Sequence, residues 1–300
     1  MSESKPVVLQ HLTKYYGHER GIDDVTFSID AGEVLGFLGP NGAGKTTTIR
    51  TLVGLIRATS GSAELLGDNA LRANATLRAR IGYLPGVFEI YPSYTAKQAL
   101  RFCARMRGLD CNDVIETLAE RLRLDLHRHI HDLSKGNRQK VGVIQAFMHA
   151  PDVLLLDEPT AGLDPLAQRE FEEILEEAKQ RGASVLLSSH VLSEVEHLAD
   201  RVAVISEGRV IVVERIANLK AKAPRRVHLS FDTPIQQDAF RSVSNMFDLD
   251  VHGRECSATV IGAETELLAE AVQRGVTSVR TEEARLDEIF LDLVGSGSRP

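Results

Sequence analysis

The sequence reads Gly39-Pro40-Asn41-Gly42-Ala43-Gly44-Lys45-Thr46-Thr47 between a short apolar run and a stretch with helical character. The apolar run, residues 34–38, predicts a buried strand, and residues 48–56 predict a helix. The three glycines allow backbone angles and close approaches that a side chain would block, so successive N–H groups can face a phosphate chain. The helix N-terminus adds free N–H groups and a partial positive charge. The stretch therefore predicts a phosphate-binding loop.

Two side chains of this loop have defined roles in such a site. Lys45 is placed to reach the β- and γ-phosphates of a nucleotide, and the Thr46 hydroxyl to take a Mg²⁺ coordination position. The spacing G-x-x-x-x-G-K-[ST] is fairly specific, and the strand before it and the helix after it strengthen the interpretation. The alternative is a glycine-rich turn that only happens to precede Lys-Thr.

The composition is that of an ordinary globular protein. Of the 300 residues, 43% are hydrophobic and 26% are charged. No run approaches the roughly 18 to 20 consecutive apolar residues of a membrane span, and residues 1–6 lack the apolar core of a signal peptide. The net charge of −7 argues against general nucleic-acid binding. We therefore expect a cytoplasmic protein that reaches a membrane only through a partner; the three scattered cysteines fit this reducing compartment.

Strands and helices alternate over most of the first 220 residues. Residues 7–35 predict β structure before the loop, and residues 61–67 and 81–85 predict two further strands. Residues 95–150 switch to helical periodicity and predict a helical subdomain. The α/β pattern returns at residue 153, so we expect a mainly parallel sheet covered on both faces.

The order and length of the predicted strands and helices change near residues 221–224, where we place a domain boundary. The rest predicts a small α+β domain of the split βαβ, ferredoxin-like plan. Its expected elements are strands at 226–231, 247–252, 256–261 and 276–281, and helices at 234–245, 264–274 and 285–293. This part of the sequence contains no set of catalytic residue types.

Polar side chains follow two predicted strands of the larger domain. Asp157 and Glu158 end an apolar run, and His190 follows another. Parallel sheets place their ligands at this carboxyl edge. Asp157 would hold Mg²⁺, Glu158 would orient or deprotonate an attacking water, and His190 would hydrogen-bond that water or a γ-phosphate. Paired acids or a lone histidine, taken singly, are explained as readily by structural roles.

A second anion-binding arrangement occurs at Leu133-Ser134-Lys135-Gly136-Asn137-Arg138-Gln139, where a hydroxyl, a glycine and a predicted helix N-terminus coincide. A protein that already holds phosphate with one loop has no obvious use for another, so we expect this segment to serve a nucleotide bound to another copy. The alternative is an ordinary helix with Ser134 as its N-cap. Residues 161–164 likewise either sense the filled site or cap the next helix.

Together these motifs resemble the nucleotide-binding subunit of an ATP-binding cassette (ABC) transporter, over roughly residues 5–220. The matched motifs are Walker A at 39–47, the signature L-S-x-G-x-x-Q at 133–139, Walker B with its glutamate at 153–158, the D-loop at 161–164, the switch histidine at His190 and the adenine-stacking aromatic at Tyr16. The signature is specific to the family, whereas Walker A is not. From its position alone, Tyr16 could equally pack at a sheet edge.

The resemblance implies a fold and a set of site residues. The fold is an α/β P-loop cassette with an antiparallel β subdomain, a helical subdomain at about 87–150 and an accessory domain at 225–294. Glu158 and His190 would be catalytic, and Thr46 and Asp157 would hold Mg²⁺. ATP would contact Tyr16, Gly39, Pro40, Asn41, Gly42, Ala43, Gly44, Lys45, Thr46, Thr47, Ser134 and Gly136. The family usually has a glutamine after the strand at 81–85, where this chain has Gly86, so no side-chain metal contact is expected there.

The resemblance also implies partners. Two copies would dimerise through ATP on a separate integral membrane permease, at the inner face of the cell membrane, to export a drug, antibiotic or lipid-like cargo. One alternative is a soluble ABC ATPase acting on nucleic acid or the ribosome, but the chain shows one P-loop, no heptad array and an acidic balance. Another is a nucleotide sensor that does not hydrolyse, but Glu158 and His190 are both present.

Overall fold

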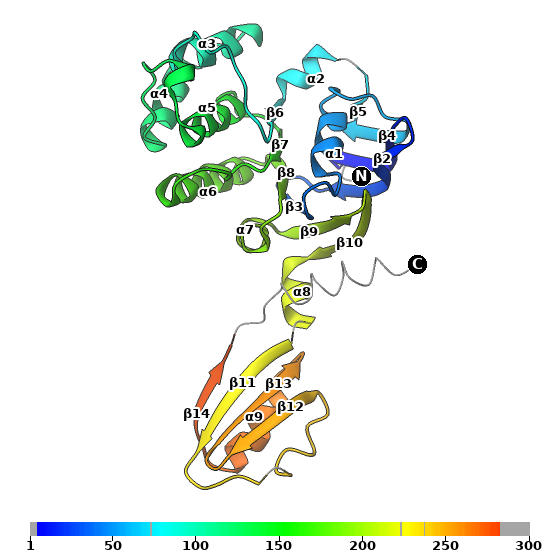
Figure 1. The fold of residues 1–300 in the computed structure, drawn as a ribbon, viewed down its shortest axis with the longest axis vertical. Coiled ribbons are helices and arrows are strands. Elements are labelled where there is room, and N and C mark those ends of the chain that lie inside the picture. The colour runs from blue at the N-terminus through cyan, green and yellow to red at the C-terminus, as the bar shows by residue number, and fades with distance from the viewer. Residues whose placement is uncertain (1–4, 73, 223, 237, 283–300) are drawn as a thin grey trace. The chain divides into compact units, whose positions relative to one another are not determined.

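The structure is a computed structural model that describes residues 5–72, 74–222, 224–236 and 238–282. The chain divides into two compact units, Met1–Val213 and Glu214–Pro300 (Figure 1). This division precedes the boundary expected at 221–224, since helix α8 (Ile216–Lys222) is grouped with the second unit. The predicted helix at 285–293 lies outside the described residues.

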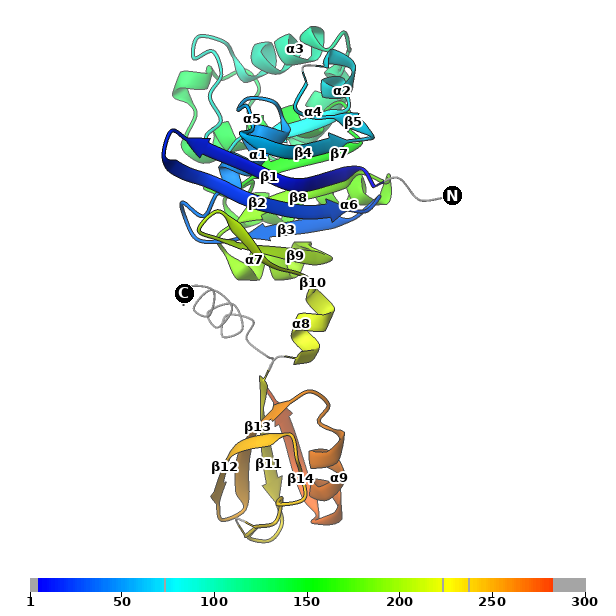
Figure 2. The ribbon, with the colours of Figure 1, turned by 90° about the vertical axis from the view of Figure 1, so that its right-hand side faces the viewer.

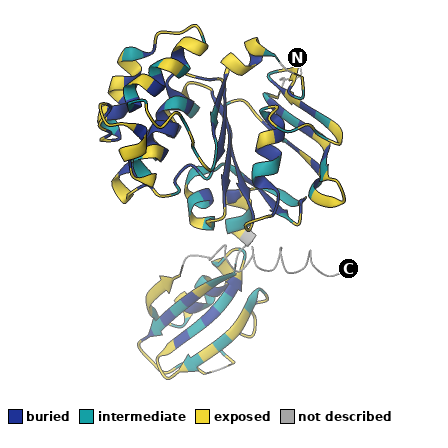
Figure 3. Ribbon diagram, turned by 45° about the horizontal axis from the view of Figure 1, so that its top comes forward, coloured by how far each residue is buried: buried dark blue, intermediate teal, exposed yellow. Residues whose placement is uncertain are grey.

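A six-stranded sheet forms the centre of the first unit. Its order is β10 (Arg209–Arg215), β9 (Arg201–Ser206), β3 (Val34–Leu38), β8 (Ser184–Ser189), β7 (Val153–Asp157) and β6 (Ile81–Leu84). The neighbours from β9 to β6 are parallel, as predicted. Every residue of β3, β7 and β8 is buried (Figure 3), as expected for the central strands of a parallel sheet that is covered on both faces.

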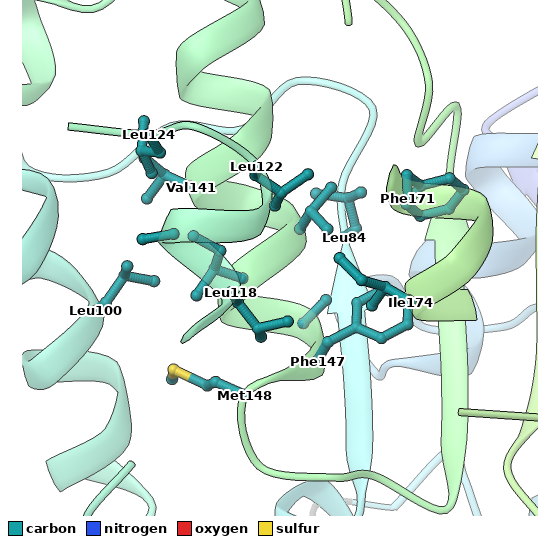
Figure 4. Close-up of a cluster of buried hydrophobic side chains, with 14 of the residues drawn as sticks. Leu84, Leu100, Leu118, Leu122, Leu124, Val141, Phe147, Met148, Phe171 and Ile174 are labelled. Carbon is teal, nitrogen blue, oxygen red and sulfur yellow. The ribbon is translucent and has the colours of Figure 1, made fainter. Parts of the chain in front are cut away.

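Helices cover one face of this sheet (Figure 1). They are α3 (Ala96–Met106), α4 (Asn112–Arg121), α5 (Lys135–Phe147), α6 (Pro165–Gln180) and α7 (Leu192–Leu198), with a 3-10 turn, η1, at Ile130–Asp132. Figure 4 shows side chains from α3 to α6 meeting Leu84 of β6 in one apolar cluster. Removing such a side chain from water stabilises the fold by about 1.5–3 kcal/mol. The predicted helical subdomain is thus anchored on the sheet by α5 and α6.

The opposite face of the sheet carries helix α1 (Lys45–Leu52) and a second, antiparallel sheet. The order of this sheet is β2 (Glu19–Ile29), β1 (Val7–Tyr16), β4 (Ser60–Leu65) and β5 (Asp68–Asn69), and the short helix α2 (Ala75–Ala79) follows it. Phe27 of β2 meets Phe37 of β3 with ring centroids 5.5 Å apart. The antiparallel β subdomain is therefore present as predicted and packs against the parallel sheet.

The second unit contains a four-stranded antiparallel sheet with helix α9 (Thr265–Gln273) on one face (Figure 2). Its order is β12 (Met246–His252), β13 (Glu255–Ile261), β11 (Pro224–Phe231) and β14 (Val276–Thr281). Leu267 and Ala271 of α9 pack in one cluster with Val227 and Leu229 of β11. Across both units, none of the helices in the described part of the chain is long and apolar enough to span a membrane.

The predicted helix at 234–245 is wrong: its described residues form turns. The spacing of apolar residues that suggested a helix does identify buried side chains, since Phe240 and Val243 are 0% and 6% exposed. At the end of this segment, Asn245 Nδ2 donates to the carbonyl oxygens of Ile261 and Ala263 at 3.0 and 2.8 Å, which attaches the segment to the end of β13. The segment also contains Ser242, Ser244 and Asn245, and serine and asparagine are weak helix formers because their side chains favour non-helical hydrogen bonds.

Candidate nucleotide-binding site

The loop Gly39–Gly44 joins the carboxyl end of β3 to the first residue of α1. Lys45 is only 6% exposed, and its Nζ donates to the carbonyl oxygens of Gly39 and Pro40 at 2.6 and 3.2 Å. Gly44 has φ 109°, and a Cβ there would lie 2.6 Å from Ile22 Cγ2. The loop therefore curls around a buried ammonium group, and only glycine fits at its last position.

The side chains of Thr46 and Asp157 meet beside this loop, and Ser188 supports Asp157 from the other oxygen. Thr46 Oγ1 donates to Asp157 Oδ2 at 2.8 Å, and Ser188 Oγ donates to Asp157 Oδ1 at 2.6 Å. A hydroxyl and a carboxylate are ligands suited to Mg²⁺, which takes one or two protein oxygens and fills the rest of its shell with water and phosphate. Among the described residues, no group of three or more His, Cys, Asp or Glu could hold a metal ion.

Gly86 lies against this pair without a side chain of its own. A Cβ built at Gly86 would lie 3.1 Å from Asp157 Oδ2. Glycine has no side chain, so residue 86 carries no group that could bind a metal ion through its side chain. Nearby, burial and the negative charge of Asp157 raise the pKa of Tyr83, while Arg50 lowers it.

The carboxylate of Glu158 lies between two nitrogen-bearing groups. His190 Nδ1 is 2.8 Å from Glu158 Oε2, and Lys45 Nζ is 3.5 Å from Glu158 Oε1. The Glu158 side chain is 20% exposed, so water can reach it. A carboxylate held in this way can accept a proton from a water molecule, which is the role predicted for it.

Lys45, Glu158 and His190 line one groove of about 450 Å³, which falls within the usual range for a small-molecule site. The predicted metal ligand Asp157 is buried and does not line this groove. Of the predicted residues, it is lined by Tyr16, Pro40, Asn41, Gly42, Ala43, Gly44, Lys45, Thr46, Thr47, Glu158 and His190. Gly39 takes part through its carbonyl contact with Lys45. The Tyr16 ring is 47% exposed at the groove, with Lys14 Nζ 5.0 Å from its centroid. Arg20 and Glu19 also line it and were not predicted.

Ser134 and Gly136 do not line the groove of their own chain. Ser134 is exposed, and its Oγ caps α5 by accepting from Asn137 N at 3.2 Å. The capping role considered from the sequence is therefore present in the structure. Asp164 likewise caps α6, accepting from Ala167 N at 3.0 Å, and pairs with Lys140 at 3.1 Å. These two contacts, the cap first, lower the pKa of Asp164.

Two buried residues that contact the site residues, Ser188 and Gln139, were also not predicted from the sequence. Ser188, which is fully buried, donates to Asp157 and accepts from Glu158 N at 3.1 Å. Gln139 was assigned only to a motif, yet its side chain contacts the main chain at Glu158 and Pro159. A hydroxyl two residues before His190, at the end of a parallel strand, was the signal that could have revealed Ser188.

Comparison with known proteins identifies similar chains. A family model described as ABC transporter matches residues 22–161. The bacitracin transport ATP-binding protein BcrA of Bacillus licheniformis is 34% identical over 96% of both chains. The linearmycin resistance ATP-binding protein LnrL of Bacillus subtilis is 32% identical over 95% of this chain and 97% of its own. A solved ATP-binding subunit of an ABC transporter superposes with a TM-score of 0.68 and 32% identity, over 71% of this chain and 91% of its own.

Proposed function

Since this chain belongs to the ABC transporter family as an ATP-binding subunit, and such subunits hydrolyse ATP to drive transport, we propose that two copies close on ATP to power export through a separate permease. The observation that carries this proposal is the Glu158 carboxylate, which is held between Lys45 and His190 beside the loop Gly39–Gly44. A non-hydrolysing sensor would not need this arrangement.

The residues divide the reaction among them. Tyr16 stacks on the adenine, and the N–H groups of residues 39–47 and Lys45 bind the phosphates. Thr46 and Asp157 would hold Mg²⁺, which would supply positive charge to the phosphate oxygens. Glu158 takes a proton from water as the water oxygen bonds to the γ-phosphorus and the bond to the β-phosphate oxygen breaks, giving ADP and phosphate. His190 orients Glu158 and the γ-phosphate.

The second copy supplies what the groove of one chain lacks. Ser134 and Gly136 lie at the start of α5 and outside the groove, and Ser134 is exposed at this helix N-terminus, where another molecule can reach it. We assign them to the γ-phosphate bound by the partner copy. Each site then contains the loop of one chain and the signature of the other.

The names of the relatives guide the assignment of cargo and location. One is named for bacitracin transport and another for linearmycin resistance, so we assign an antibiotic, drug or lipid-like cargo. The permease would hold this subunit at the inner face of the cell membrane. We place the cassette at residues 5–220 and assign residues 225–294 a regulatory or dimer-stabilising role.

The central test is Glu158→Gln with ATP and Mg²⁺. We expect this variant to bind ATP, to lose most hydrolysis and to elute as a dimer in size-exclusion chromatography with light scattering. Lys45→Ala is the matched control, because it should lose nucleotide binding and stay monomeric. Hydrolysis by Glu158→Gln near the parent rate, or a monomer at saturating ATP, would contradict the proposal.

The permease is tested by affinity purification from membranes in mild detergent. Recovery of one multi-span protein is the expected result. Recovery of ribosomes or nucleic acid in its place would contradict the transport assignment and support the soluble alternative.

A further inference from the structure

The signature helix α5 contacts the catalytic strand segment of its own chain. Gln139 lies on α5 and is 5% exposed. Its Nε2 donates to the carbonyl oxygen of Glu158 at 3.2 Å and to that of Pro159 at 2.9 Å. A buried amide that makes both hydrogen bonds fixes the two peptide groups that follow the Glu158 Cα.

The peptide group before Glu158 is fixed from the other side. Glu158 N donates to Ser188 Oγ at 3.1 Å and to Ser188 O at 3.2 Å. Glu158 itself has φ 51°, in the left-handed region that costs a residue with a side chain roughly 1–2 kcal/mol. Such a conformation persists only where the surroundings impose it. Here β8 holds one peptide group and α5 holds the next.

Two further contacts join α5 to the same segment. A Cβ built at Gly136 would lie 2.4 Å from the carbonyl oxygen of Gly162, so the helix backbone approaches this loop closely. Lys140, 7% exposed, pairs with Asp164 at 3.1 Å. The first turns of α5 and residues 158–164 are therefore attached at three points, and a shift of one element acts on the other.

We propose that Gln139 is a positioning residue for the catalytic carboxylate, which sets the backbone of Glu158 according to the position of α5. This inference rests on the proposed function, in which the start of the same helix contacts the nucleotide of the partner copy. Closure of Ser134 on that nucleotide would then change the backbone position of Glu158 in the same chain as Ser134. Gln139 is the side chain that connects one site with the other.

The test compares Gln139→Met, which keeps the length of the side chain and removes the donor, with Gln145→Met. Gln145 is half-buried six residues further along α5, roughly 9 Å away along the helix axis. We expect kcat for ATP hydrolysis to fall roughly ten- to hundredfold in Gln139→Met, as for other small misplacements of a catalytic group. KM for ATP and ATP affinity should change less than about threefold, because the phosphate loop is untouched. Gln145→Met should keep the parent kcat.

Gln139→Glu and a double variant sharpen the result. Gln139→Glu places acceptors against two carbonyl oxygens, so kcat should fall further than in Gln139→Met. In the double variant Ser188→Ala/Gln139→Met, the fold-loss in kcat should be smaller than the product of the two single fold-losses, because both side chains hold the backbone of Glu158.

Three results would overturn the inference. The first is a kcat in Gln139→Met equal to that of the parent. The second is a higher KM and weaker ATP binding in this variant with an unchanged kcat. The third is a double variant whose loss in kcat equals the product of the two single losses. Each leaves the proposed function intact, provided that the parent hydrolyses ATP and Glu158→Gln dimerises. A parent without hydrolysis would refute the proposed function itself.

Discussion

Ser188 holds two functional groups at once, and replacing it by alanine tests the geometry of the site. Its Oγ donates to Asp157 Oδ1 at 2.6 Å and accepts from Glu158 N at 3.1 Å. Ser188 and Asp157 are 0% and 1% exposed, so water does not readily replace the lost hydroxyl. Ser188→Ala therefore leaves a buried carboxylate oxygen without this donor.

The cost follows from these contacts. A hydrogen bond to a charged group contributes about 1.5–3 kcal/mol. Glu158 N keeps the Ser188 carbonyl oxygen at 3.2 Å, so the second loss is smaller. We expect the free energy of unfolding of the first unit to fall by about 2 kcal/mol. For a unit of this size the Tm should fall by about 4–8 °C.

Ser184→Ala is the matched control. Ser184 lies on the same strand, is equally buried, and donates to the neutral carbonyl oxygen of Asp30 at 2.9 Å. Its loss should cost about 1 kcal/mol. Urea unfolding followed by circular dichroism measures both variants, and ATPase activity is titrated with Mg²⁺. Only Ser188→Ala should need more Mg²⁺ for half-maximal activity, because only it frees Asp157.

The outcome that would refute this reasoning is specific. If Ser188→Ala were no less stable than Ser184→Ala and required no more Mg²⁺, the hydroxyl would not hold the Asp157 carboxylate. The metal site would then have to be assigned without Ser188.

Three further predictions concern other parts of the first unit. Tyr16→Ala should weaken ATP binding about tenfold in a fluorescent-nucleotide titration, whereas Tyr16→Phe, which keeps the ring, should bind like the parent. Gly136→Ala should lose activity and lower the Tm, because its Cβ would lie 2.4 Å from the Gly162 carbonyl oxygen; a fully active, equally stable variant would exclude that close approach. Burial, with the nearby Arg107 charge, lowers the pKa of His149 to about 4, so the unfolded chain binds this proton at higher pH than the folded chain does. The free energy of unfolding measured in urea should therefore decrease as the pH drops from about 6.5 towards 4, and this decrease should be smaller in His149→Gln.

The motifs of the site could be predicted because each occupies a fixed place in a parallel sheet. Walker A joins a strand to a helix, and Asp157, Glu158 and His190 all follow strands whose carboxyl ends share one edge. Gln139 and Ser188 could not be assigned in the same way. Their partners are main-chain atoms and a carboxylate 19 to 31 residues away, and neither residue type announces such contacts.

The error at 234–245 has a different origin. Apolar spacing reports which side chains are buried, and Phe240 and Val243 are buried as their spacing indicates. It does not report how the backbone satisfies its hydrogen bonds. Here an asparagine side chain bonds to the end of β13, and the segment packs as turns.

Gly86 gives the groove a wall made of backbone beside Asp157. Cassettes of the usual pattern carry a glutamine side chain at this point. An ATP-competitive inhibitor with a small cationic substituent directed at Gly86 would approach the Asp157 carboxylate here and meet steric hindrance in those other cassettes. The missing side chain is thus a basis for selective inhibition within a large and otherwise similar family.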